Sequence, residues 1–404
     1  MKEGFGKLIS LTEALRTLDG VVRRFEGAEA LPLMEAAGRI TAEAVKSGVD
    51  VPHFRRAAMD GYAVRAEETF GASYERPIAL RVTGVIEPGD VPTSAIDSGR
   101  CVRISTGGAM PPNADAVVMV EYTDRTDDDT IVVQSAVAPG ANVVEVGSDL
   151  KVGDTVVDAG VLLGPRRLGA LAAAGVASVK VVARPRVAVL STGAELLAAD
   201  EPLAPGKVFN INSVTLSAAL ARFCCEPVDC GVVPDRLDAM REAVLRAAAD
   251  SELVLISGGS SLGTGDLVPR VLAALGRLLF HGIAVKPGKP TSAGVVADTL
   301  VLGLPGYPTS ALSNFYMLVL PILERMLGTR WPRPSVRVAL GRKTVSTIGR
   351  HEFMAVRLDG GEAFPLRRGS SAITTLALAD GFVEIDAETE VLPAGVEVTV
   401  RLFP

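Results

Sequence analysis

The sequence predicts an α/β domain with a doubly wound, mostly parallel sheet, accompanied by additional β-rich domains. Between Pro185 and Gly328, short apolar segments alternate with segments of helical periodicity, which is the pattern of a parallel sheet covered by helices. From about Arg76 to Val144, and again beyond Trp331, short segments rich in β-branched residues are separated by Gly, Pro and Asp, as in compact β domains. A chain of 404 residues is also too long for one ordinary core, so we expect several domains.

The individual elements follow this division in order. Apolar residues recur at three- and four-residue steps from Leu8 to Phe25 and predict a helix, with Ser10 and Glu13 spaced as a capping box. The acidic run TDRTDDDT predicts a solvated hairpin tip. In the α/β domain the expected strands are RVAVLS, PVDCGVV, ELVLI, LLFHGIAV and TLVLGL. The expected helices are NSVTLSAALARF, DRLDAMREAVLRAAAD, LVPRVLAAL and the long apolar TSALSNFYMLVLPILERML.

Composition excludes several classes of function. The net charge of -6 argues against nucleic-acid binding, because no basic face would follow phosphates. No apolar run approaches the ~20 residues that cross a bilayer, and the first residues lack a signal-peptide pattern, so we expect a cytoplasmic protein without a membrane partner. The cysteines form no CxxC pair and are expected as small buried side chains: Cys101, Cys224, Cys225 and Cys230. The three histidines are far apart in sequence, which disfavours a zinc site or a Ser-His-Asp triad.

The loops that follow the predicted strands carry the polar chemistry. The glycine-rich SGGSSLGTGD, from Ser257 to Asp266, follows ELVLI. TGAEL supplies Glu195, and PDRL supplies Asp235. In an open parallel sheet these loops emerge at one edge, where ligands bind. Glycine-rich turns and helix N-termini attract phosphate, and clustered carboxylates need a cation such as Mg²⁺ between them.

Two further loops belong to the same edge. KPGKP supplies Lys286 and Lys289, and GLPGYPTS supplies Pro305 and Pro308. Lysines add positive charge toward an anion. The combination of amides, lysines and acids therefore predicts a phosphorylated ligand bound together with a divalent cation.

Each of these residues has a simpler interpretation when it is taken alone. Glu195 could be a first-turn acid favoured by a helix dipole, and Asp235 and Asp266 could be N-caps. Lysines are commonly solvated surface charges, and the two prolines could only stiffen a turn. Three capping acids beside two lysines at one edge are less expected than a binding site. Local physics favours plain turns for Asp60-Gly61 and for the glycines that open TGGAMPPNADAVVMVE.

Taken together, the motifs resemble the MoeA family of molybdopterin molybdenumtransferases, which includes the E domain of gephyrin. The matching segments occur in the family's order and cover nearly the whole chain: AMDGYAV (58–64), TGGAMPPNADAVVMVE (106–121), GSDLKVGD (147–154), STGAEL (191–196), SGGSSLGTGD (257–266), KPGKP (286–290), GLPGYPTSA (303–311) and LADGF (378–382). Tyr307 stands where many relatives have Asn, and EFMAV lacks an Arg that often follows the EF pair.

The resemblance implies an elongated four-domain subunit whose α/β domain is of the molybdopterin-binding type. The implied boundaries are a discontinuous N-terminal helical and linker domain at 1–50 and 148–178, an inserted β-rich domain at 51–147, the α/β domain at 179–330 and a C-terminal β domain at 331–404. It also implies a homodimer with the ligand cleft between the α/β domain of one chain and the β-rich domain of the other.

The implied reaction starts from adenylylated molybdopterin and molybdate or tungstate, and it yields molybdenum cofactor and AMP in a Mg²⁺-dependent cleavage. Position by position, the resemblance assigns Asp266, Asp235 and Glu195 to the cation and to catalysis, together with Asp60 and Asp149. The residues that it assigns to substrate binding are Thr106, Ser257, Gly258, Gly259, Ser260, Lys286, Lys289, Pro305, Pro308 and, more weakly, Arg350 and Ser371. Transient contacts with the adenylyltransferase and with cofactor-receiving enzymes are expected partners.

Two other functions fit parts of the sequence. The α/β domain alone resembles molybdopterin adenylyltransferases of the MogA type, which consume ATP. The same fold also serves as a scaffold in gephyrin, without the need for catalysis. The surrounding β domains, the LPGYP motif and the intact acids favour the molybdenum-inserting enzyme.

Overall fold

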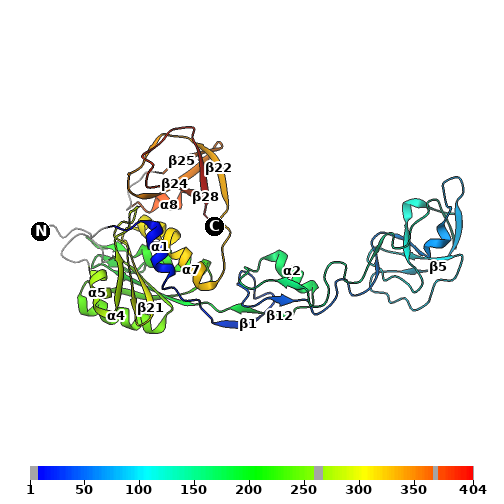
Figure 1. Ribbon diagram of the computed structural model, residues 1–404, viewed down its shortest axis with the longest axis horizontal. Helices are drawn as coiled ribbons and strands as arrows, with labels where there is room; N and C mark the ends of the chain where they lie inside the picture. The colour runs from blue at the N-terminus through cyan, green and yellow to red at the C-terminus, as the bar shows by residue number, and fades with distance from the viewer. Residues whose placement is uncertain (1–7, 259–266, 367–371, 404) are drawn as a thin grey trace.

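The computed structural model describes residues 8–258, 267–366 and 372–403. The chain is elongated (Figure 1), with an α/β domain and a C-terminal β domain at one end and a second β domain, labelled by β5, at the other. β1, β12 and α2 lie between the two ends. The predicted fold class, an α/β domain with additional β-rich domains in an elongated chain, is confirmed.

The sheet of the α/β domain has six strands in the order β16-β13-β17-β21-β20-β18. β16, β13, β17 and β21 are parallel to one another. β20 is antiparallel to both of its neighbours, β21 and β18, so β18 runs in the same direction as the four parallel strands. β17 is buried at every residue and β13 at all but its first, as expected of strands covered on both faces. The strands are β13 (Arg186–Thr192), β16 (Glu226–Val233), β17 (Leu253–Ser257), β18 (Arg277–His281), β20 (Ser292–Val296) and β21 (Thr299–Leu304).

Helices cover both faces of this sheet and form two separate cores. On one face, residues of α4 and α5 pack with Ala188, Leu190 and Val254. On the other face, residues of α1, α3 and α7 pack with Val187 and Val189. α1 therefore contributes to the core of the α/β domain although it lies at the beginning of the chain. The helices are α1 (Leu11–Asp19), α3 (Ile211–Arg222), α4 (Leu237–Asp250), α5 (Leu267–Leu275), α6 (Pro308–Asn314) and α7 (Leu320–Leu327).

The predicted long apolar helix is present but is not a regular α-helix throughout. Between α6 and α7, residues Phe315–Val319 form a π-helical segment, η3. Pro321 lies in the first turn of α7, and proline has no N–H to donate to the preceding turn. A π segment accommodates such a break without ending the helix.

The connecting region and the distant β domain are built from short strands. β1 (Ala28–Pro32) pairs with β12 (Ser178–Val182), and β2 (Val45–Lys46) pairs with β11 (Thr155–Val157) beside α2 (Pro165–Ala173). The distant β domain has a six-stranded sheet in the order β7-β4-β6-β5-β9-β8 and a separate β3–β10 pair. Its strands are β3 (Arg56–Ala57), β4 (Gly61–Val64), β5 (Ile78–Ile86), β6 (Arg100–Ile104), β7 (Ala116–Met119), β8 (Thr123–Arg125), β9 (Thr130–Val133) and β10 (Val143–Val144). β8 and β9 form the predicted acidic hairpin.

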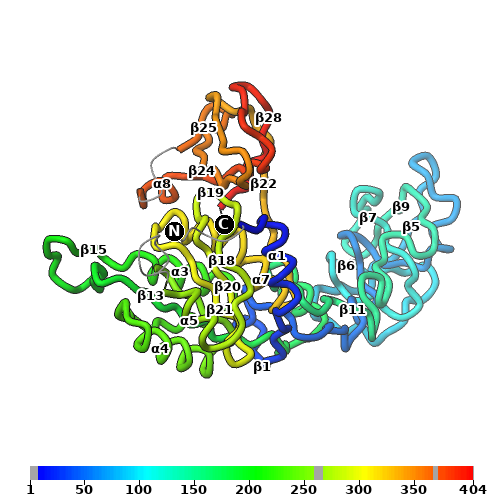
Figure 2. Tube along the Cα trace, turned by 60° about the vertical axis from the view of Figure 1, so that its left-hand side comes forward, coloured from blue at the N-terminus to red at the C-terminus, as the bar shows by residue number. Residues whose placement is uncertain are grey.

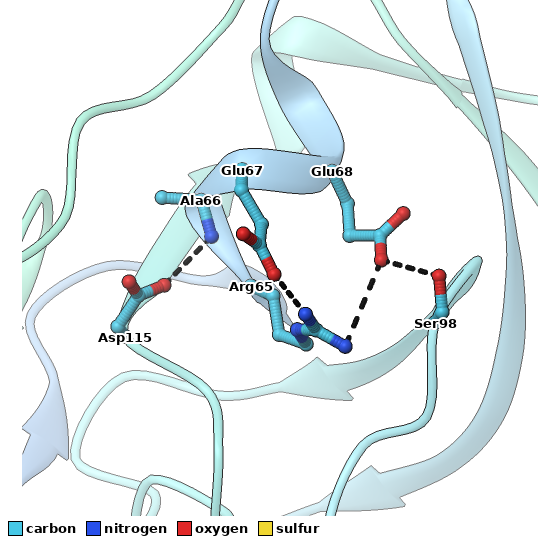
Figure 3. Close-up of polar contacts among 6 residues, drawn as sticks. All are labelled: Arg65, Ala66, Glu67, Glu68, Ser98 and Asp115. Atoms are coloured by element: carbon cyan, nitrogen blue, oxygen red, sulfur yellow. Dashed lines mark hydrogen bonds and ion pairs between the residues drawn. The ribbon is translucent and has the colours of Figure 1, made fainter.

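A polar cluster holds the turn that follows β4 (Figure 3). Asp115 accepts a hydrogen bond at 2.6 Å from the Ala66 N–H, at the start of the 3₁₀ helix η1 (Ala66–Thr69). Arg65 pairs with Glu67 and, at 3.9 Å, with Glu68, whose carboxylate also accepts from Ser98 at 2.6 Å. These contacts satisfy the first turn of a short helix, so we assign the cluster to folding.

The C-terminal domain is a closed sheet. β24 pairs with both β25 and β26, and β26 pairs with β28, so the order β24-β25-β22-β28-β26 returns to β24. β19 (Val285–Lys286), from the α/β domain, adds to this barrel in parallel with β24. The predicted strand LLFHGIAV is therefore divided between two sheets. The barrel strands are β22 (Ser335–Leu340), β24 (His351–Asp359), β25 (Glu362–Pro365), β26 (Gly381–Ile385) and β28 (Glu397–Leu402).

The remaining short elements complete the chain. β14 (Leu196–Leu197) and β15 (Val208–Phe209) form an arm that projects from the α/β domain (Figure 2), β23 (Thr344–Val345) pairs with β27 (Val391–Leu392), and η2 (Val120–Tyr122) and α8 (Thr374–Ala377) are single turns. Cys101, Cys224 and Cys225 are buried as expected, but Cys230 is exposed on the edge strand β16. Within the described residues, every helix is too short or too polar to cross a bilayer.

An aromatic cluster joins the barrel to the α/β domain. Phe382 stacks on Phe353 with ring centroids 4.2 Å apart, and it also contacts Phe403 and, at 6.0 Å, Tyr316 of η3. Such buried aromatic pairs contribute beyond their buried area. The relative placement of the two domains therefore depends on this cluster.

Replacing Phe382 with Ala is expected to destabilise the protein by roughly 3–5 kcal/mol, as for other buried aromatic truncations, and to lower the Tm by roughly 10 °C. Thermal unfolding followed by circular dichroism measures the change. Phe70→Ala is the control, because Phe70 is 57% exposed and its loss is expected to leave the Tm within a degree or two. Equal effects of the two substitutions would contradict the assignment of this cluster.

Candidate functional site

The carboxyl ends of the α/β strands meet at one edge of the sheet, and the predicted loops leave from that edge. β13 ends at Thr192, β16 at Val233, β17 at Ser257 and β21 at Leu304. β18 runs in the same direction as β21, since β20 is antiparallel to both. KPGKP therefore leaves the same edge as the other loops, as predicted.

Asp235 lies against the end of β13. The Thr192 hydroxyl donates a hydrogen bond to Asp235 Oδ1. Asp235 is not the N-cap of α4, because Arg236 occupies that position and no side chain caps the helix. An exposed acid held by a hydroxyl at a strand end keeps its second oxygen, Oδ2, for a ligand.

Glu195 is the second acid at the end of β13. Its two carboxylate oxygens lie 2.7 Å from where a Cβ on Gly193 would be, so the side chain folds back over the residue next to Thr192. Glu195 is exposed and lies just before β14, outside any helix, so it is not a first-turn acid. Asp235 and Glu195 therefore flank the same two residues, Thr192 and Gly193.

Two glycine turns make the floor of this edge. Gly258 has a φ of +100°, and a Cβ there would lie 2.3 Å from the Thr192 carbonyl oxygen. Gly306 lies next to this turn, where a Cβ of its own would be at an ordinary contact distance, 3.5 Å, from the Gly258 Cα. Only glycine combines the positive φ with the close approach at position 258, which explains the glycine that follows β17.

Asn212, in the first turn of α3, holds the two glycine turns together and was not predicted. Its Nδ2 donates to Ser257 Oγ at 2.6 Å and to the Gly306 carbonyl at 2.8 Å. The residue is 7% exposed, and its buried Oδ1 has no hydrogen-bond partner among the residues that the structure describes. Asn212 is the first residue of the predicted helix NSVTLSAALARF, where Asn is expected as an N-cap, so its contacts with the two glycine turns were not predictable from the sequence.

The KPGKP loop packs against α6. A Cβ on Gly288, whose φ is +112°, would lie 1.7 Å from Asn314 Nδ2 at the end of α6. α6 begins at Pro308, so this contact links KPGKP to the GLPGYPTS loop. Pro305 is buried, whereas Tyr307 is 60% exposed in front of the helix.

The two lysines of this loop are partly buried. Lys286 Nζ lies 3.1 Å from Glu352 Oε2 of the barrel, and the Lys289 carbonyl accepts from the Ile283 N–H at 3.0 Å. Arg350 precedes β24, the strand that pairs with Lys286, and its N–H donates to the Thr347 carbonyl at 3.2 Å. The cationic residues thus gather where the α/β domain meets the barrel.

Four of the predicted site residues lie outside the described residues: Gly259, Ser260, Asp266 and Ser371. The predicted role of Asp266, either as an N-cap of α5 or as a cation ligand, therefore stays a prediction. Among the residues that the structure describes, no group of three His, Cys, Asp or Glu side chains is close enough to hold a metal ion.

Asp60, Thr106 and Asp149 lie away from this edge. Asp60 and Thr106 belong to the β domain at the opposite end of the chain in Figure 1, and Asp149 lies where the chain leaves that domain, with its N–H donating to the Val51 carbonyl. One chain therefore does not bring all of the predicted residues together.

Asp60 and Thr106 form a defined unit. Asp60 Oδ1 accepts from the Thr106 N–H at 2.6 Å and from the Thr106 hydroxyl at 2.8 Å. The backbone hydrogen bond, then the hydroxyl and then the positive charge of Arg103 lower the pKa of Asp60 below 3.8. Asp60 is exposed, so the unit presents a carboxylate to solvent instead of forming a plain turn.

Comparison with known proteins covers the same regions. Three family models match in order: the MoeA N-terminal region (domain I and II) at residues 9–175, the probable molybdopterin binding domain at 188–325 and the MoeA C-terminal region (domain IV) at 337–403. A molybdopterin molybdenumtransferase from Haemophilus influenzae is 34% identical over 93% of this chain and 94% of its own.

The chain belongs to the MoeA family. A second molybdopterin molybdenumtransferase, from Bacillus subtilis, is 31% identical over 98% of this chain and 94% of its own. The crystal structure of a molybdopterin biosynthesis MoeA protein from Pyrococcus horikoshii superposes with a TM-score of 0.89, at 33% identity, over 98% of this chain and all of that one. The carboxyl edge described above lies within residues 188–325, the part of this chain that matches the probable molybdopterin binding domain.

Thr106→Val removes the hydroxyl donor to Asp60 but keeps the backbone N–H, so the Asp60 pKa is expected to rise part of the way to 3.8. A lowered pKa stabilises the fold above the unfolded value, and this contribution is lost as the pH falls through the folded value. Carboxyl NMR titration of Asp60 measures the shift. Thr83→Val, on β5 of the same sheet, is the control. An unchanged Asp60 titration in Thr106→Val would contradict the role of the hydroxyl.

Proposed function

We propose that this protein is a molybdopterin molybdenumtransferase that converts adenylylated molybdopterin and molybdate to molybdenum cofactor and AMP. The observation that carries the proposal is the match of all MoeA regions in order along the chain, together with relatives of that name aligned over more than nine tenths of it. The arrangement of the carboxyl edge supports it, because amides, acids and cations meet there.

The residues at this edge divide into two roles. The glycine turn at Gly306 is suited to offer backbone N–H groups to the ligand's phosphates, whereas the Gly258 N–H donates to the Leu304 carbonyl at 3.2 Å and closes the turn beside it. Lys286 and Lys289 supply positive charge toward phosphate or molybdate oxygens, and we assign Arg350 and Ser371 to substrate binding as well. Pro305 and Pro308 give the second turn its fixed shape, and we assign Ser257, Gly258 and the next residues in sequence, Gly259 and Ser260, to substrate binding.

The acids are suited to the cleavage of the adenylate. When a water molecule attacks phosphorus, a new P–O bond forms as the phosphoanhydride P–O bond breaks, and negative charge develops on the departing AMP and on the phosphate that stays with the pterin. Asp235, held at Oδ1 by Thr192, and Glu195 flank the end of β13. We assign both to this step together with Asp266.

The donor set fits Mg²⁺. This ion usually takes one or two carboxylates and completes its shell with substrate phosphates and water, which agrees with two exposed acids on either side of Thr192 and Gly193. Asp235 and Glu195, with Asp266, would hold it. When bound, it would neutralise charge on the phosphate oxygens. The chain's own residues would hold the phosphates in the orientation that cleavage requires.

We further propose that the complete site forms between two chains. Asp60 and Thr106 present a carboxylate at the end of the chain opposite to Asp235. A two-fold dimer would bring the β domain of one chain to the α/β domain of the other and would make two equivalent sites. Asp149 would lie beside the same cleft.

A nucleotide balance tests the function. Purified protein given adenylylated molybdopterin, Mg²⁺ and molybdate is expected to release one AMP per cofactor formed without consuming ATP. Consumption of ATP with free molybdopterin would instead identify an adenylyltransferase. Absence of both reactions in a folded protein would favour a scaffold. Replacing molybdate with tungstate in the same assay determines the oxyanion.

Asp235→Asn is expected to slow AMP release by about 100-fold or more, because an amide supplies neither the charge nor the basic oxygen of the acid. Asp238→Asn is the matched control, since Asp238 is an exposed acid three residues further on, in the first turn of α4, and its activity should stay within twofold. Both variants should keep the wild-type Tm. Asp235→Asn with full activity would remove the residue from the mechanism.

Mixing two inactive variants tests the two-chain site. Asp60→Ala and Asp235→Asn, unfolded together and refolded, give hybrid dimers in which one of the two sites has both acids. Random pairing should restore about a quarter of wild-type AMP release. The two variants refolded separately and then combined without exchange are the control. A site contained in one chain would give no recovery from either mixture.

A further inference from the structure

A strand of the α/β domain is held by the C-terminal barrel directly at the cationic part of the site. β19 carries Lys286 and pairs in parallel with β24, so that Lys286 is opposite Glu352. β19 and β24 lie beside each other in Figure 2. The segment before β19 is held on both sides, because the Ala284 N–H donates to the Ile9 carbonyl at 2.8 Å and the His351 N–H donates to the Ala284 carbonyl at 2.8 Å.

The side chains of Lys286 and Glu352 form an ion pair in which the carboxylate is much less exposed to solvent than the ammonium. Lys286 Nζ is 3.1 Å from Glu352 Oε2, the Lys286 side chain is 37% exposed, and that of Glu352 is 8% exposed. The Ser346 hydroxyl donates to the same Oε2 at 2.8 Å. The carboxylate is thus fixed inside the barrel, and the ammonium reaches outward from it.

This inequality distinguishes the pair from a surface ion pair. A mobile surface pair contributes little, because two long side chains lose freedom to meet. Here one partner is already immobile and buried, and a buried carboxylate is costly unless it is paired and hydrogen-bonded. The ammonium has three N–H donors, so one can be directed at Glu352 while others remain available for an anion.

We propose that Glu352 is a positioning residue, supplied by the C-terminal barrel, that fixes the Lys286 ammonium at the edge of the α/β domain where it contacts an oxyanion of the ligand. This role rests on the proposed function. It gives the barrel a part in the reaction although Glu352 itself does not contact the substrate. Glu352 acts through Lys286, and Ser346 holds Glu352.

Glu352→Gln is the test variant, because glutamine keeps the size of the side chain and an acceptor for Ser346 but removes the charge that holds Lys286. The KM for adenylylated molybdopterin is expected to rise about tenfold, equivalent to about 1.4 kcal/mol, with kcat changed less than twofold. Glu384→Gln is the matched control. Glu384 is a carboxylate in β26 of the same barrel, paired with Arg401 at 3.1 Å, and its loss should leave KM unchanged.

A double-mutant cycle separates positioning from general structure. Lys286→Met should also raise KM, and adding Glu352→Gln to it should raise KM no further, since the two residues act as one unit. Because Lys286→Met removes a cationic partner from a buried carboxylate, its Tm is expected to fall, and the double variant should recover it. A tenfold effect of Glu352→Gln that persists in the Lys286→Met background would overturn the proposal, as would an unchanged KM in Glu352→Gln.

A measurement that needs no enzymatic turnover tests the positioning role of Glu352 independently of the proposed function. Trace acylation of the intact dimer or monomer, followed by mass spectrometry of the peptide that contains Lys286, reports how firmly the ammonium is held. Acylation should be several-fold faster in Glu352→Gln than in the wild type or in Glu384→Gln. Wild-type protein that releases no AMP would refute the transferase but not this result, whereas equal acylation in all three would refute the positioning role.

Discussion

The candidate site depends on the close approach of the backbone turns at the carboxyl edge of the parallel sheet. The Gly258 Cα lies against the carbonyl of Thr192, and Gly306 lies against Gly258. A side chain at Gly258 would force β13 and β17 apart at this end, because its Cβ would lie only 2.3 Å from the Thr192 carbonyl oxygen. Asn212 then holds Ser257 and Gly306 with one amide group. The two acids lie beside the same strand end, Asp235 against Thr192 and Glu195 over Gly193.

The acids and the cations of the site have different structural supports. Glu195 follows β13, a buried parallel strand, and Asp235 follows the exposed edge strand β16 but is hydrogen-bonded to Thr192 at the end of β13. Lys286 is placed by β19, which hydrogen-bonds to the barrel instead of to that sheet. The barrel is attached through the aromatic cluster around Phe382. Packing far from the ligand therefore sets the distance between the acidic and basic halves of the site.

The elongated shape has a further consequence for the distant β domain. The Asp60–Thr106 unit is preorganised, with two hydrogen bonds to one carboxylate oxygen, yet it lies at the opposite end of its own chain from Asp235. Preorganised polar groups on an exposed surface are typical of binding sites. In the proposed dimer, the length of the chain is what lets one subunit reach the α/β domain of the other.

The sequence by itself determined the fold class, the family and the loops of the site. Periodicity and strand-end glycines are local signals, and the acids of TGAEL and PDRL follow their strands as predicted. Only the tertiary structure decided what those residues contact. In the structure, Asp235 hydrogen-bonds to Thr192 instead of capping a helix, and Glu352 forms an ion pair with Lys286. The segment LLFHGIAV is divided between two sheets, and α1 packs in the core of the α/β domain. The physical reason is that a pattern shows which face of an element is buried, whereas its partner comes from residues up to hundreds of positions away.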